Sequence, residues 1–204
     1  MSDTAPSELL LPTAYLPPIG YFQLLQHHPN AVVEQWETYP KQTLRNRTRI
    51  LTANGVQRLS VPVVKPQGNH TLTRDIQISY SEAWHMQHWR AIVSAYSASP
   101  FFLYYRDALE AVLMQHHERL IELNDTLMTL VLRWLKMDYQ LHYTEQFTVP
   151  SQQDNDFRYN TEAIPYQQQD YYQVFDTKYP FQPNLSILDL LFNMGPESMS
   201  YLAI

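Results

Sequence analysis

The chain contains no cysteine and only four glycines among its 204 residues. Without cysteine it has no disulfide framework, no thiolate metal site and no cysteine nucleophile. The Gly-rich phosphate-binding loop, the G-x-G-x-x-G dinucleotide motif and the G-x-S-x-G elbow of serine hydrolases are absent as well. These absences remove the familiar signatures of nucleotide binding and of acyl-enzyme chemistry.

Long apolar segments are also missing. No window approaches eighteen apolar residues free of charge, and the first residues carry no basic segment ahead of an apolar one, so we expect neither a membrane span nor a signal peptide. A formal net charge of −6 argues against nucleic acid and against a membrane surface as partners. We therefore expect a cytoplasmic protein, and the sequence does not indicate its oligomeric state.

The composition that remains is typical of a globular protein, with 45% hydrophobic and 17% charged residues. We expect one domain over residues 1–204. Within it, residues 1–80 are mostly strands with one short helix, residues 81–137 are helical, and residues 138–204 are rich in loops with a final helix. The predicted fold class is α/β: a small Rossmann-like or mixed sheet with an N-terminal βαβ unit and a β-hairpin, packed by helices.

The βαβ unit is predicted from two short apolar runs. Residues 9–11 and 31–33 are expected to form strands, and residues 21–26 between them have helical spacing. A strand, helix and strand in so short a segment favour a parallel pair. Ligands collect at the carboxyl ends of such strands, which here means residues 15–17 and 34–36.

The hairpin is predicted from the turn signal Ala53-Asn54-Gly55, which lies between strands expected over residues 43–52 and 57–64. This pairing places the basic residues of the first strand opposite Arg58 and Ser60 or their neighbours.

Other elements follow from periodicity and capping signals. Residues 151–170 have no period, and a loop of this length in a compact domain is either functional or mobile. Strands are expected over residues 74–79, 139–143 and 171–175, and helices over residues 83–96, 101–116, 118–136 and 187–193, the last one capped by residues 183–186 and closed by Gly195-Pro196.

Residues 39–49 concentrate positive charge in an acidic protein: Lys41, Arg45, Arg47 and Arg49 fall within this segment. On an extended strand the three arginines share one face, where their donors would suit a carboxylate or phosphate. The alternative is a solvated face whose arginines pair with local acids. Asn46 points to the opposite face, so either the segment bends there or Asn46 has a structural role in the hairpin.

His88 and Glu37 are the candidate catalytic groups. His88 lies on the helix predicted for residues 83–96, where it can act as a base or hydrogen-bond donor, or simply pack. His85 lies three residues before it, but no third ligand accompanies the pair at a fixed spacing, so we expect no metal and no cofactor. Glu37 would serve as a general base only with a raised pKa, and an ion pair with Arg45 or Lys41 is the simpler interpretation.

Several segments resemble those of the WbqC-like family, in order and over nearly the whole chain. They are Tyr15-Leu-Pro-Pro-Ile-Gly-Tyr-Phe22, Tyr39-Pro-Lys-Gln-Thr-Leu-Arg-Asn-Arg-Thr-Arg-Ile50, Leu59-Ser-Val-Pro-Val63, Trp84 with His88-Trp89, Tyr96 with Ser99-Pro-Phe101, Phe181-Gln-Pro-Asn-Leu-Ser-Ile-Leu-Asp-Leu-Leu-Phe-Asn193, and Gly195-Pro-Glu197. The resemblance implies a bacterial protein encoded near surface-polysaccharide genes, and glycyl or other acyl transfer to an amino sugar has been suggested for such proteins.

The resemblance also implies which residues bind substrate. They are Tyr15, Gly20, Tyr21, Lys41, Arg45, Asn46, Arg47, Tyr96 and Asp189, with His88 beside them. Two departures stand out: Pro12-Thr13 replaces a Gln-Pro pair, and residues 151–170 contain no glycine where longer relatives have a Tyr-Leu-Ser-Gly-like turn. If that turn binds ligand in the relatives, this chain binds differently or has lost activity.

Two functions follow as expectations. The first is a glycyl or acyl transferase that acts on a small anionic molecule or nucleotide sugar in surface-polysaccharide biosynthesis. The alternative is a non-catalytic binding or assembly protein that uses a basic, tyrosine-rich surface, since tyrosine and arginine are enriched at interface hot spots.

Overall fold

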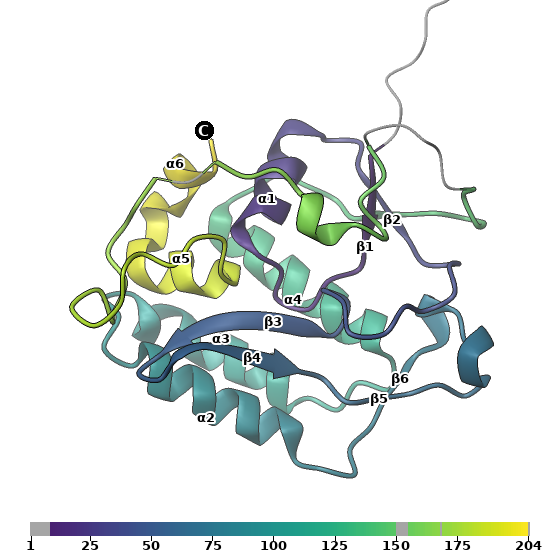
Figure 1. Ribbon diagram of the computed structural model, residues 1–204, viewed down its shortest axis with the longest axis horizontal. Helices are drawn as coiled ribbons and strands as arrows, with labels where there is room; N and C mark the ends of the chain where they lie inside the picture. The colour runs from purple at the N-terminus through teal and green to yellow at the C-terminus, as the bar shows by residue number, and fades with distance from the viewer. Residues whose placement is uncertain (1–8, 150–154, 168, 204) are drawn as a thin grey trace, which may run out of the picture.

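A three-stranded parallel sheet contains the predicted βαβ unit. The structure is a computed structural model that describes residues 9–149, 155–167 and 169–203. Strands β1 (Leu10–Pro12), β2 (Val32–Glu34) and β7 (His142–Tyr143) pair in the order β1-β2-β7, with both pairs parallel. Helix α1 (Ile19–His27) connects β1 to β2 and ends just before Pro29, which cannot continue it. The α/β prediction is thus confirmed (Figure 1).

The predicted hairpin is also present, as the antiparallel strands β3 (Arg47–Thr52) and β4 (Gly55–Ser60). Gly55 follows the turn with φ +94°, a backbone conformation that favours glycine. The expected start of the first strand at residue 43 was wrong, because residues 41–46 form turns instead.

Beyond β4 the chain forms a second, shorter antiparallel pair. Strand β5 (Val63–Val64) pairs with β6 (Gln77–Ile78), and two 3₁₀ turns lie between them, η1 (Gly68–His70) and η2 (Thr73–Asp75). Pro62 separates β4 from β5, since proline has no N–H for a ladder. The strands expected over residues 57–64 and 74–79 are therefore shorter than predicted.

The predicted helices are confirmed, with small differences at their ends. They are α2 (Trp84–Tyr96), α3 (Phe102–Met114), α4 (Leu120–Leu135) and α5 (Ile187–Met194), followed by η4 (Gly195–Glu197) and a further helix α6 (Ser198–Leu202). The Ser186 side chain caps α5 by accepting a hydrogen bond from the Leu188 N–H at 3.4 Å. Among the described residues, no helix is long and apolar enough to cross a membrane.

Two apolar clusters hold these elements together. One joins the hairpin to α2, α3 and α4, and the other joins α1 to α4, α5 and β1. Tyr105 and Trp134 pack against both clusters, with ring centroids 4.9 Å apart. Figure 1 shows the hairpin crossing the molecule, with α5 close to its turn end and α6 beyond α5.

Candidate functional site

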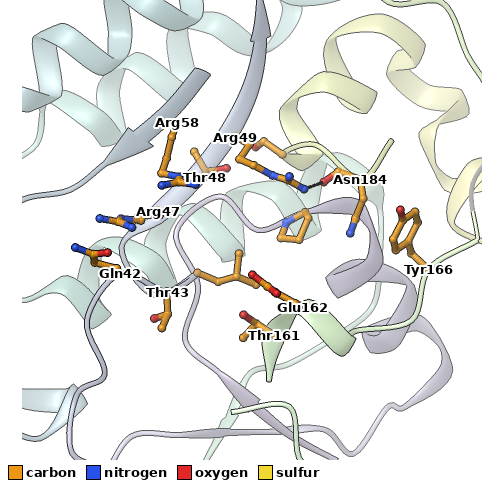
Figure 2. A pocket seen from close by; sticks show the side chains of 13 residues that line it. Gln42, Thr43, Arg47, Thr48, Arg49, Arg58, Thr161, Glu162, Tyr166 and Asn184 are labelled. Carbon is orange, nitrogen blue, oxygen red and sulfur yellow. Dashed lines mark hydrogen bonds between the residues drawn. The ribbon is translucent and has the colours of Figure 1, made fainter. Parts of the chain in front are cut away.

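A cleft of about 410 Å³ opens along one face of the hairpin (Figure 2). Its walls come from segments that are far apart in the sequence. They are Pro18 before α1, the turn at residues 42–44, strands β3 and β4, residues 161–166 including η3 (Thr161–Ala163), and residues 184–186 before α5.

Three arginines of the hairpin line this cleft: Arg47 and Arg49 alternate on β3, and Arg58 lies directly opposite Arg49 on β4. Arg49 donates a hydrogen bond to the Asn184 carbonyl at 3.3 Å, whereas the buried Nε of Arg47 has no hydrogen-bond partner. Within the described part of the chain, none of the three forms an ion pair. Like charges directly opposite on a sheet repel, so an anion bound here would relieve a repulsion that the hairpin otherwise contains.

Arg45 does not line the cleft. It is fully buried, its Nε donates to Glu37 Oε1 at 2.8 Å, and its Nη2 contacts the same oxygen. Of the two interpretations of Glu37 that the sequence allowed, general base or ion-pair partner, the structure shows the ion pair. The turn at residues 41–46 is what directs Arg45 inward, away from the face that Arg47 and Arg49 share.

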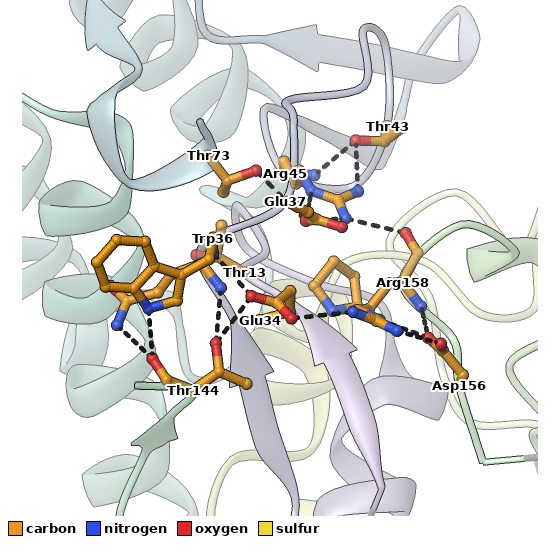
Figure 3. Close-up of polar contacts among 12 residues, drawn as sticks. Thr13, Glu34, Trp36, Glu37, Thr43, Arg45, Thr73, Thr144, Asp156 and Arg158 are labelled. Atoms are coloured by element: carbon orange, nitrogen blue, oxygen red, sulfur yellow. Dashed lines mark hydrogen bonds and ion pairs between the residues drawn. The ribbon is translucent and has the colours of Figure 1, made fainter. Parts of the chain in front are cut away.

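A second buried arginine, Arg158, lies at the carboxyl end of β2 (Figure 3). Its Nη1 donates to Glu34 Oε2 at 2.9 Å, and its Nε donates to Asp156 Oδ1 at 2.8 Å. Glu34 also accepts hydrogen bonds from the Thr144 hydroxyl at 2.8 Å and from the Thr148 N–H at 3.0 Å. The strand end where the sequence predicted a ligand thus holds a buried charge network formed by Glu34, Glu37, Arg45, Asp156 and Arg158.

The charge network joins two walls of the cleft. Arg45 donates to the Thr43 hydroxyl at 3.2 Å, and Thr43 belongs to the turn that lines the cleft. The Nη2 of Arg45 donates to the Arg158 carbonyl at 2.9 Å, and the wall formed by Thr161 and Glu162 follows Arg158 closely in the chain. Arg45 is therefore a positioning residue for the cleft, and its replacement would change the shape of the cleft as well as its charge.

Glu37 is the least satisfied member of the charge network. Its Oε1 accepts from Arg45 and from the Thr73 hydroxyl at 3.3 Å, but its buried Oε2 has no hydrogen-bond partner. Burial raises the pKa of Glu37, and the neighbouring Arg45 guanidinium only partly opposes that effect. This carboxyl group is not part of the cleft lining.

His88 lies beneath the hairpin and does not line the cleft. Its Nδ1 is 2.9 Å from the Tyr15 hydroxyl, and its ring packs edge-on against Trp84 with centroids 5.1 Å apart. Burial lowers the pKa of His88 to about 4, although a hydrogen bond with the Ser60 backbone opposes the shift. At neutral pH the imidazole is therefore neutral and packed into the interior.

Tyr96 and Asp189 form a separate buried group. Asp189 accepts hydrogen bonds from the Tyr96 hydroxyl at 2.9 Å, from the Tyr171 hydroxyl at 2.6 Å and from Gln173 Nε2 at 2.8 Å. Burial raises the pKa of Asp189, and these donors oppose the shift. The same contacts explain why residues 171–175 are not the strand expected there: their side chains bind the first turn of α5.

The remaining predicted side chains do not line the cleft. Asn46 Nδ2 donates to the Val61 carbonyl at 2.9 Å, so Asn46 has the structural role in the hairpin that was one alternative. Tyr21 donates to the Pro12 carbonyl at 2.9 Å, and Lys41 is exposed outside the cleft. Of the side chains predicted for the site, Arg47 is the one that lines the cleft as the described residues define it.

Gly20 packs against the residues that form one wall of the cleft. Its N–H donates to Asn184 Oδ1 at 2.9 Å, and a Cβ at this position would lie 2.9 Å from Tyr166 Cβ and 3.2 Å from the Pro165 carbonyl oxygen. Both Tyr166 and Asn184 line the cleft. Close packing between α1 and residues 165–166 therefore requires glycine.

Replacing Gly20 with alanine should lower the free energy of unfolding by about 1–3 kcal/mol, because residues 165–166 must move to admit the methyl group. Urea denaturation measures this change. Gly68→Ala is the comparison, since a Cβ there meets no atom within 4 Å and the variant carries backbone strain alone. Equal stability of Gly20→Ala and the unchanged protein would show that residues 165–166 can move to admit the methyl group without loss of stability.

Sequence reasoning missed several residues that the structure brings to this region. The predicted hairpin placed Arg58 opposite the basic strand, but the sequence did not predict that Arg58 lines a cleft. Glu162, Tyr166 and Arg158 lie in a segment without periodicity, so no local signal marked them. Among the described residues, no group of three or more His, Asp or Glu side chains is arranged to hold a metal ion.

Comparison with known proteins identifies the family of this chain but assigns it no activity. The WbqC-like protein family matches residues 13–160 and 152–201 of this chain. A relative from Mycobacterium tuberculosis, described as uncharacterized protein Rv1507c, is 30% identical over 217 residues, which cover 92% of this chain and 94% of the relative. No solved structure matches the chain.

Proposed function

We propose that this chain, which belongs to the WbqC-like protein family, binds a phosphorylated small molecule in the cleft along its hairpin. One observation carries the proposal: Arg47, Arg49 and Arg58 line one cleft, and none of them has an ion-pair partner among the described residues. Guanidinium groups match the geometry of phosphate and carboxylate oxygens. The net charge of −6 favours a small anion over a polyanion.

The size and lining of the cleft fit a ligand larger than a bare phosphate. Its volume of about 410 Å³ falls within the range of about 300–1,000 Å³ typical of small-molecule sites. Gln42, Thr43 and Thr161 add amide and hydroxyl groups that can bind the hydroxyls of a ligand. A nucleotide sugar, whose diphosphate joins a nucleoside to a hydroxylated sugar, is the class we propose.

Group transfer in surface-polysaccharide biosynthesis is the catalytic form of the same proposal. Its support is the family resemblance alone, because His88 and Glu37, the bases that the sequence predicted, do not line the cleft. A transferase needs a base within reach of the proton that it removes, and Glu162 is the one carboxylate among the described lining residues. The arginines support binding directly, so binding is supported better than transfer.

Isothermal titration calorimetry with pyrophosphate and UDP-glucose tests the binding proposal. Replacing Arg58 with threonine should weaken both ligands by about tenfold, equivalent to about 1.4 kcal/mol. Arg90→Ala is the matched control: Arg90 is an exposed arginine of α2 outside the cleft lining, and its loss changes the net charge equally. Equal affinities in all three proteins would overturn the proposal.

A stability measurement separates lost binding from lost folding. Without ligand, Arg58→Thr should be at least as stable as the unchanged protein, because it removes the repulsion with Arg49, worth about 0.2–1 kcal/mol, and threonine suits a strand. Thermal unfolding with and without pyrophosphate gives both quantities. A destabilised Arg58→Thr variant would mean that Arg58 serves the fold and not a ligand.

A further inference from the structure

A carboxylate faces the arginines across the cleft. Figure 2 shows Glu162 on the far side of the cleft from Arg47, Arg49 and Arg58. Among the described lining residues it is the only acidic one, and its side chain forms neither an ion pair nor a hydrogen bond within the described chain. The cleft therefore has one positive side and one negative group opposite it.

The position of Glu162 is fixed on both sides of η3. Before it, residues 155–157 pair with β1: the Leu10 N–H donates to the Asn155 carbonyl at 2.9 Å, and the Phe157 N–H donates to the Leu10 carbonyl at 3.0 Å. After it, the Gln167 N–H donates to Gln23 Oε1 on α1 at 3.2 Å. Although its side chain is exposed, Glu162 belongs to a segment held against the sheet and α1.

Charge of opposite sign at the two sides of a site gives selectivity by repulsion. A nucleotide sugar whose phosphates bind the arginines can place its sugar toward Glu162. A carboxylate or a phosphate carried by that sugar would meet a like charge, whereas a sugar hydroxyl would donate a hydrogen bond to the Glu162 oxygens. Repulsion of the wrong ligand is a common source of specificity.

We infer that Glu162 is a specificity residue, which selects ligands in which a phosphate group is joined to a neutral, hydroxylated sugar. The inference rests on the proposed function, since it requires the phosphate to bind at the arginines. Within the nucleotide-sugar class it favours a sugar that carries only neutral hydroxyls and rejects a sugar that carries its own carboxylate or phosphate. Thr161, beside Glu162 in the lining, adds a hydroxyl to the same end of the cleft.

Calorimetry with UDP-glucose and UDP-glucuronate tests this inference, because the two sugars differ by one carboxylate. The unchanged protein should bind UDP-glucose about tenfold more tightly, which corresponds to a difference of about 1.4 kcal/mol. Glu162→Gln keeps the size of the side chain and should bring the two affinities to within about threefold, by tightening the binding of UDP-glucuronate. Glu82→Gln, an exposed acid outside the cleft, should keep the original ratio.

The outcomes separate this inference from the binding proposal. If the unchanged protein binds neither pyrophosphate nor UDP-glucose, both fall. If pyrophosphate binds but Glu162→Gln leaves the ratio of the two sugar nucleotides unchanged, the specificity role alone is wrong. Equal tightening of both sugar nucleotides would also overturn it, because Glu162 would then compete with phosphate for the arginines.

Discussion

Replacing Arg45 with methionine is expected to lower the free energy of unfolding by about 3–5 kcal/mol. Arg45 and Glu37 are both fully buried, so the variant leaves the Glu37 carboxylate in the interior without its cation. The variant also loses the hydrogen bonds to the Thr43 hydroxyl and the Arg158 carbonyl. Urea denaturation at pH 7 measures the loss, and Arg90→Met, at an exposed position, should change stability by less than about 0.5 kcal/mol.

A double variant distinguishes lost charge pairing from lost packing. Adding Glu37→Gln to Arg45→Met removes the uncompensated carboxylate, so the double variant should be more stable than Arg45→Met alone. Lowering the pH should also raise the stability of Arg45→Met relative to the unchanged protein. Burial already raises the pKa of Glu37, and without Arg45 the carboxyl group takes up its proton more readily in the folded state. The difference in free energy of unfolding between the unchanged protein and Arg45→Met should therefore shrink as the pH falls. A difference that does not depend on pH would contradict this account.

The second large effect is the pH dependence that His88 gives to stability. Its pKa is about 4 in the folded protein, compared with 6.5 in an unperturbed histidine. The unfolded chain therefore takes up this proton first, so the stabilising contribution is present above pH 6.5 and is lost as the pH falls toward 4. The difference corresponds to about 3 kcal/mol.

Comparison with His88→Gln isolates this contribution from those of other groups. Asp125 acts in the opposite direction, because burial raises its pKa to about 6 and its contribution grows as the pH falls. Electrostatic interaction with His85 lowers the His88 pKa further. Between pH 7 and pH 4 the unchanged protein should lose about 3 kcal/mol more than His88→Gln, whereas His70→Gln, an exposed histidine, should follow the unchanged protein. Parallel pH profiles for the unchanged protein and His88→Gln would refute a buried, neutral His88.

Local patterns in the sequence predicted most of the regular elements and little of the site. The hairpin follows from Asn54-Gly55 between apolar alternations, and α4 follows from its leucine stripe, because both signals lie within one element. The direction of Arg45 does not follow, because it depends on the turn at residues 41–46, where Gln42 has φ 64°. A segment whose sequence alternates like a strand can turn at one such residue and bury a side chain further along, here Arg45.

The charge network was beyond sequence reasoning for a different reason. Arg158 pairs with Glu34 across 124 positions, and nothing in residues 151–170 marks one arginine as buried. The assignment of ligand binding to Tyr15, Tyr96 and Asp189 came from family resemblance, and such resemblance does not distinguish a residue that contacts a ligand from one that supports the fold. The structure places these three in buried hydrogen bonds.

The hydrogen bond from Arg45 to the Arg158 carbonyl spans 113 positions of the chain, so it can form only late during synthesis. During synthesis the hairpin leaves the ribosome long before residues 155–158 exist, and domains fold from the N-terminus as they emerge. Until that later segment arrives, Arg45 lacks the Arg158 carbonyl, Glu34 lacks the Arg158 guanidinium, and the wall that carries Glu162 is missing. A nascent chain would therefore complete this cleft only after residues 155–166 have emerged.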